Sequence, residues 1–140
     1  MDESSLLQRK RQLKHKLLLE RQKLYGRRFL PQCAYCGQGI LGSPDMHEVF
    51  FTKGDLQGVD RLAHLIYHRC NCVLVHPGGN TSACHAGAAT RAGQGLAARQ
   101  LIRYESLVSV RDYILMVAGQ IKNKGLAEQA LRLIGGEDAL

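Results

Sequence analysis

The middle third of the chain concentrates the side chains that bind metals. All five cysteines and five of the six histidines lie between positions 33 and 85. An odd number of cysteines argues against a disulfide scaffold and for a metal site in a reducing compartment. Cys33-Ala34-Tyr35-Cys36 precedes Gly37, and two thiolates at this spacing on a tight turn can bind one ion. A redox pair normally opens a helix, whereas this one runs into Gly-Gln-Gly, so the pattern favours a zinc knuckle.

Zinc needs two further ligands, and four downstream residues are candidates. Cys70 and Cys72 alternate with Asn71, so in a strand both would lie on the face opposite Asn71. His76 and Cys84 flank a loop that can fold back and bring them together. Spacing alone leaves both pairings open.

Positive charge is concentrated at the N-terminus. Residues 1–28 contain nine basic and three acidic residues, a net charge of +6, whereas the remaining residues sum to +1. The commonest polyanion available to such a segment is nucleic acid. We therefore expect sequence-independent DNA contacts from the basic residues of this arm, and a further contact from one basic residue of the middle segment: Arg9, Lys10, Arg11, Lys14, Lys16, Arg27, Arg28 and Lys53.

Length and composition place these residues in a small globular protein. The chain has 140 residues, of which 45% are hydrophobic and 22% charged, enough for one modest core. No apolar run approaches the roughly 20 residues of a membrane span, and the N-terminus does not resemble a signal peptide. The expectation is a soluble, cytoplasmic protein.

Three segments position the metal-binding residues. Residues 1–30 form a basic arm in which a leucine stripe predicts a helix over Ser5–Arg28; the stripe consists of Leu6, Leu13, Leu17 and Leu24, widened by Leu7 and Leu18. This stripe must pack on the body or on a second copy, which leaves a homodimer open. Residues 31–90 form a turn-rich core with strands expected at Met46–Thr52 and Cys72–His76. So small a core needs a metal for stability.

The third segment, residues 91–140, is helical and should pack on the core. One helix is expected over Leu96–Glu105. Ser109-Val110-Arg111-Asp112 reads as a capping box that opens a second helix, although Ser106 could open it earlier. Gly125 is expected to end that helix, and a third helix is expected over Leu126–Ile134.

The order of these motifs resembles the zinc-containing type of the HNH, or His-Me finger, nucleases, which have the ββα-metal fold. The resemblance covers positions 33 to 85. Cys33 to Cys36 match the first knuckle, and residues 45–50 match the strand that carries a histidine. Residues 71–76 match an Asn, an apolar strand and the third zinc ligand, and Cys84-His85 match the final Cys-His pair.

Three departures from the family pattern are visible. The third zinc ligand is His76 where the family has Cys, and seven residues rather than two separate it from Cys84. Many relatives carry Asp-His or His-His, in which the first residue binds the catalytic metal and the second is the general base. This chain has His47-Glu48. Either His47 is the base, with Met46 at the ligand position and Asp45 as a substitute, or His47 binds the metal and Glu48 takes the position of the base.

The resemblance implies an α+β fold, in which a small zinc-stabilised ββα-metal (HNH) core is flanked by an N-terminal basic helix and C-terminal helices. It also implies a metal-dependent DNA endonuclease of the one-metal HNH type. Structural zinc would bind the four ligands in the family register, and magnesium or manganese would be the catalytic ion. The implied zinc ligands are Cys33, Cys36, His76 and Cys84, and the implied catalytic residues are His47, Glu48, Asn71 and His85.

His47 is the expected base because an imidazole with a pKa near 6.5 is neutral at working pH, whereas Glu48 would need its pKa raised by burial. Asn71 would hold the metal or the strand of the base, and His85 would bind the catalytic ion. Two alternatives remain: a catalytically inactive zinc-ribbon protein that binds DNA or assists packaging, and a zinc-stabilised protein that recruits a partner through its N-terminal helix. Proteins of this size in the family often come from phages or mobile elements.

Overall fold

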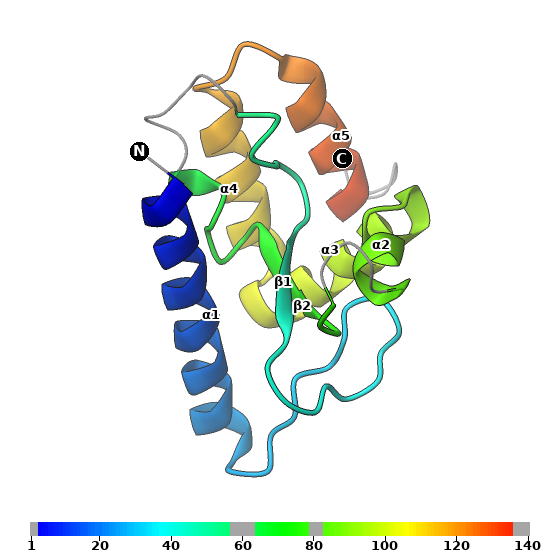
Figure 1. Cartoon of the computed structure of the whole chain (residues 1–140). Coiled ribbons are helices and arrows are strands. Elements are labelled where there is room, and N and C mark those ends of the chain that lie inside the picture. Colours follow the sequence, from blue (N-terminus) through cyan, green and yellow to red (C-terminus); the bar gives the residue numbers. More distant parts are fainter. Residues whose placement is uncertain (1–2, 57–63, 79–82, 136–140) are drawn as a thin grey trace.

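The computed structural model describes residues 3–56, 64–78 and 83–135 (Figure 1). A two-stranded sheet lies among helices, so the expected mixed α+β class is confirmed. No helix of these described ranges combines the length and the apolar content that a bilayer span requires. The elements in chain order are α1 (Glu3–Tyr25), β1 (Asp45–Glu48), β2 (Cys72–Val75), α2 (Ala83–Ala88), α3 (Arg91–Glu105), α4 (Leu107–Ala118) and α5 (Lys124–Gly135).

The two strands form an antiparallel pair against which α2 packs. Asp45 lies opposite Val75, and Glu48 lies opposite Cys72. All four residues of β2 are buried, which matches the apolar sequence Cys-Val-Leu-Val. β1 is shorter than the strand expected over Met46–Thr52. The N–H of Val49 still donates to the backbone carbonyl of Asn71, but the chain then bends because the N–H groups of Phe50 and Phe51 donate to the side chain of Asn71 instead of to a strand.

Helix α1 packs along the body of the protein (Figure 1). Leu6 and Leu17 of the leucine stripe are buried, and Leu17 belongs to the same core as the C-terminal helices. Leu24 at the end of the stripe is exposed. The helix ends at Tyr25, before the expected Arg28, because Gly26 adopts a left-handed conformation with a φ of 97°.

A charged clamp joins the C-terminal part of α1 to the end of α3. The guanidinium of Arg69 bridges the carboxylates of Glu20 and Glu105, at 2.5 Å from each. Beside it, the guanidinium of Arg21 lies 3.8 Å from the centre of the Tyr104 ring. The orientation of α1 on the body is therefore fixed at several points.

The boundaries of the C-terminal helices differ from the sequence expectation. Ser106 caps α4 by accepting a hydrogen bond from the N–H of Ser109, so the earlier of the two expected starts is the one observed. The expected boundary at Gly125 is wrong: α4 ends at Ala118 with Gly119 as its C-cap, and Gly125 lies within α5. An exposed glycine at the first turn of a helix costs little, and tertiary packing of α5 outweighs it.

Candidate functional site

The Cys-x-x-Cys segment folds into a tight turn that is attached to β2. The N–H of Cys33 donates to Gln38, and the N–H of Gly37 donates back to the carbonyl of Cys33. Gly37 has a φ of 77°, which favours glycine at this position. The N–H of Ala34 donates to the carbonyl of Leu74 in β2 at 2.9 Å, which places the turn beside the end of that strand.

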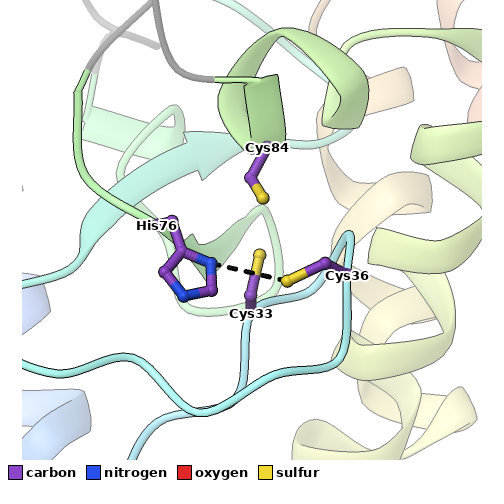
Figure 2. Close-up of side chains that lie close together, drawn as sticks. All are labelled: Cys33, Cys36, His76 and Cys84. Atoms are coloured by element: carbon purple, nitrogen blue, oxygen red, sulfur yellow. Dashed lines mark hydrogen bonds between the residues drawn. The ribbon is translucent and has the colours of Figure 1, made fainter.

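Four side chains converge from this turn, from the end of β2 and from α2 (Figure 2). The ligand atoms of Cys33, Cys36, His76 and Cys84 all lie within 4.8 Å of one another. The Sγ of Cys36 is 3.5 Å from the Nδ1 of His76. A tetrahedral ion with bonds of about 2.3 Å requires ligand separations of about 3.8 Å. We call this group the Cys3His cluster, and its donor set could hold a metal ion.

The alternative ligands Cys70 and Cys72 lie elsewhere. Both are buried, and their thiols point at backbone carbonyls: Cys70 lies 3.7 Å from the oxygen of Ser109, and Cys72 lies 3.4 Å from that of Ile66. The choice that spacing left open is therefore decided in favour of His76 and Cys84.

The electrostatics of the Cys3His cluster also suit a cation. Burial disfavours ionisation of Cys33, but hydrogen bonds from the backbone of Cys36 and His76 outweigh it and lower the pKa of Cys33 to about 6. Burial and the neighbouring Cys33 and Cys36 sulfurs raise the pKa of Cys84 to about 12. One thiol of the cluster therefore ionises readily, and its negative charge disfavours ionisation of the next thiol. A dication among these sulfurs would reverse that repulsion.

A second polar group lies next to the Cys3His cluster, between β1 and α2. The rings of His47 on β1 and His85 on α2 meet edge to face, with centroids 5.2 Å apart. The Nδ1 of His85 is 3.7 Å from the Oδ2 of Asp45, which also accepts a hydrogen bond from the N–H of Gly78. Asp45 and His47 share one face of β1 because side chains alternate along a strand. We call Asp45, His47 and His85 the acid–histidine group.

His47 is 8% exposed, and its environment disfavours the protonated ring. Burial is the largest cause of its lowered pKa, and the neighbouring His85 adds to it, while Glu48 and the backbone of Ala88 act in the opposite direction. The Nε2 atom is buried and has no hydrogen-bond partner among the described residues. Buried polar atoms usually have a hydrogen-bond partner, so the acid–histidine group suits a bound polar ligand or a water molecule.

Glu48 lies apart from the acid–histidine group. It follows His47 in β1, so its side chain is on the opposite face of the strand. There it hydrogen-bonds Tyr67, and burial together with the Glu48 charge raises the pKa of Tyr67 to about 12. Tyr67 carries no sequence signal that would have predicted this contact. Met46, on the same face as Glu48, is part of the core.

Asn71 is fully buried, and its amide is fully engaged by backbone groups. Its Oδ1 accepts from the N–H groups of Phe50 and Phe51, and its Nδ2 donates to the carbonyls of Phe51 and Ile66. No lone pair or N–H remains for a metal. Of the two expected roles, the structure places Asn71 in the second, where it holds the chain that leaves the histidine strand.

The other histidines of the middle segment lie away from both clusters. His64 is exposed. His68 stacks on Tyr113 with ring centroids 4.5 Å apart, and its Nδ1 accepts a hydrogen bond from the N–H of Cys70. These contacts are structural.

Most basic residues expected to contact DNA are on the surface. Lys14 and Lys10 are half-buried, and Lys14 donates to Ser43 and to the carbonyl of Pro44, just before β1. This contact places α1 beside Ser43 and Pro44, the residues that lead into β1. The exposed members are Arg9, Arg11, Lys16, Arg27, Arg28 and Lys53.

Comparison with protein-family models, with curated proteins and with solved structures found no match to this chain. The function is therefore inferred from the geometry of the two clusters.

Proposed function

We propose that this protein is a metal-dependent endonuclease that hydrolyses DNA phosphodiester bonds. The observation that carries the proposal is the acid–histidine group, in which two imidazoles and one carboxylate converge from β1 and α2. Phosphodiester hydrolysis needs a base for water, a cation on the phosphate, and a frame that orients them. The ββα order of hairpin and helix agrees with the HNH resemblance of the sequence.

The Cys3His cluster is proposed as a structural zinc site. Three thiolates and one imidazole are a common ligand set of structural zinc, and no open coordination position remains for a substrate. Because Cys84 and His85 are adjacent in α2, zinc at Cys84 would fix the position of His85 relative to β1. The zinc thus supports the frame and takes no part in the reaction.

His47 is proposed as the general base, acting through Nε2. This atom has no hydrogen-bond partner among the described residues, and an imidazole can accept a proton from water near neutral pH. His85 and Asp45 are proposed to bind a magnesium or manganese ion. When bound, such an ion would stabilise the negative charge that develops on the phosphate and on the leaving oxygen. Asn71 keeps β1 and the following bend in place.

Exposed basic residues of α1 are proposed to bind DNA phosphates without reading sequence. Arg9, Arg11 and Lys16 are exposed, whereas Arg21 and Arg69 are used in packing. Counterion release makes such binding steeply dependent on salt.

Cleavage of a supercoiled plasmid tests the proposal. We expect nicked and linear products with magnesium or manganese and none with EDTA. His47→Ala should abolish them, whereas His64→Ala, which removes an exposed histidine outside both clusters, should not. Folded protein that binds zinc and DNA but cuts no plasmid, linear or branched substrate would contradict catalysis. It would favour the inactive DNA-binding alternative. The core position of Met46 also supports that alternative, because many HNH nucleases carry a metal ligand at the corresponding position.

A further inference from the structure

A cleft of about 660 Å³ is lined by residues that follow the acid–histidine group in the chain. It lies between the bend after β1, the start of α3 and the face of α5, and Figure 1 shows α5 approaching α2 and α3. Its apolar wall includes Val49, Phe50, Leu126 and Leu133. The volume is within the range of about 300–1,000 Å³ that is usual for small-molecule sites.

The polar side of the cleft is cationic. Arg91 and Arg132 line it together with Gln94 and Gln129, and no aspartate or glutamate of residues 3–56, 64–78 and 83–135 does. Neither arginine forms an ion pair with a carboxylate of the described part of the chain. Two guanidiniums match the oxygens of a phosphate, and glutamine side chains match the edge of a base.

The position of the cleft connects it with the proposed reaction. Val49 is two residues beyond His47, and Arg91 is six residues beyond His85. The bend that forms the apolar wall is held rigidly, because Asn71 binds the backbone of Phe50 and Phe51. Two sides of the cleft therefore follow directly in the chain from β1 and α2, the elements that carry the acid–histidine group.

We propose that the cleft binds one unpaired nucleotide of the DNA strand, next to the bond that is cut. The base would lie on the apolar wall, and its phosphate would be held by Arg91 and Arg132. This inference rests on the proposed function and adds the substrate class: DNA with a displaced or unpaired base rather than continuous duplex.

Binding measured in EDTA tests the cleft independently of cleavage. The probes are two DNA molecules of equal length and charge with 2-aminopurine at one position, unpaired within a small bubble in one and paired in the other. We expect wild-type protein to bind the bubble about tenfold more tightly, with a fluorescence change confined to the unpaired base. The Arg91→Gln/Arg132→Gln variant should lose most of this preference and retain binding to duplex.

Matched variants separate the cleft from general charge effects. Arg99→Gln/Arg111→Gln removes two exposed arginines outside the cleft and should leave the preference intact. Gln129→Glu changes one exposed residue of the cleft without altering its size, and the added carboxylate should weaken bubble binding.

Three outcomes would overturn the inference: equal affinity of the wild type for both DNA molecules, full preference in the Arg91/Arg132 variant, or binding of free deoxyadenosine monophosphate more tightly than the bubble. The last would assign the cleft to a free nucleotide. A preference for the bubble in EDTA without plasmid cleavage under any metal would instead refute the proposed function and leave the cleft standing.

Discussion

Gly93 of α3 packs directly against the carbonyl group of Gly87 in α2, so closely that a Cβ atom on Gly93 would lie 1.8 Å from that oxygen. On its other side Gly87 meets the ring of Tyr35 in the Cys-x-x-Cys turn, where an added Cβ would lie 2.5 Å from the ring. Two glycines therefore allow α2 to fit between the turn and α3. His85 lies in this helix, two residues before Gly87.

Gly93→Ala should force α2 and α3 apart. Overpacking against backbone typically costs about 1–3 kcal/mol, and urea unfolding would measure the loss in free energy of unfolding. Gly95→Ala is the matched control, because a Cβ there meets nothing within 4 Å and the position is helical. This control should stabilise the protein by about 0.5–1 kcal/mol. Equal effects of the two substitutions would contradict the close approach.

Asn71→Asp should destabilise the protein strongly although it is nearly isosteric. It keeps the oxygen that accepts from Phe50 and Phe51 but places a second oxygen against the carbonyls of Phe51 and Ile66. Losing buried hydrogen bonds costs about 1–3 kcal/mol each. Asn123→Asp, at an exposed residue whose side-chain oxygen accepts from the N–H of Gly125, keeps that acceptor and should change the free energy of unfolding little. Thermal unfolding of both variants gives the comparison.

Cys84→Ser should remove the bound metal, whereas Cys70→Ser should retain it. Only the first thiol belongs to the Cys3His cluster; the second points at the carbonyl of Ser109. Elemental analysis of purified protein measures zinc directly, and a chelator should lower the melting temperature of the wild type because metal binding contributes to folding. Zinc content that persists in Cys84→Ser would show that the ion is held elsewhere.

The charged clamp should make the protein sensitive to acid. The hydrogen bond from Arg69 holds the pKa of Glu20 below its ordinary value. A carboxyl group whose pKa is lower in the folded than in the unfolded state stabilises the folded state at pH values above its unfolded pKa. This contribution is lost as the pH falls through the folded pKa. Between about pH 5 and pH 3 the stability of the wild type should therefore fall more steeply than that of Glu20→Gln. Glu128→Gln, at an exposed residue of α5, is the control and should show the slope of the wild type.

His47→Ala and Glu48→Gln should differ in cleavage. A positioned base contributes about 100- to 10,000-fold, so the loss of His47 should fall in that range with zinc content intact. Glu48→Gln should cost less, because Glu48 faces Tyr67 on the other side of β1. His85→Ala should impair cleavage as well. If Glu48→Gln proves the more damaging, and extra manganese restores His47→Ala, the roles of the two residues are exchanged.

Local sequence patterns predicted much of the metal-binding region. The turn at Cys33 to Cys36, the apolar run of β2 and the leucine stripe of α1 are short-range signals, and the structure contains all three. The convergence of His76 and Cys84, rather than Cys70 and Cys72, on the Cys-x-x-Cys turn was different: spacing allowed both pairings, and only the tertiary positions of the end of β2 and of α2 distinguish them.

Long-range contacts account for what the sequence did not predict. The early end of β1 depends on the side chain of Asn71, about twenty residues away. The clamp at Arg69 joins residues from three separate segments, and no local pattern pairs Glu20 with Glu105. The cleft beside α5 likewise exists only once the helices have packed. Tertiary structure, not propensity, fixes these features.

The Cys3His cluster joins Cys36 to His76 across forty positions of the chain, and β1 and Asn71 lie between them. An ion held there would turn this stretch into a closed ring, in which the first strand of the hairpin is topologically enclosed. A ring of this length excludes the more extended conformations of residues 36–76, so β1 gains less conformational entropy when it separates from β2. Release of the ion and separation of the two strands then become one cooperative event. Hydrogen exchange at Val49, whose N–H is bound to the carbonyl of Asn71 at 2.7 Å, would follow the residence time of the ion.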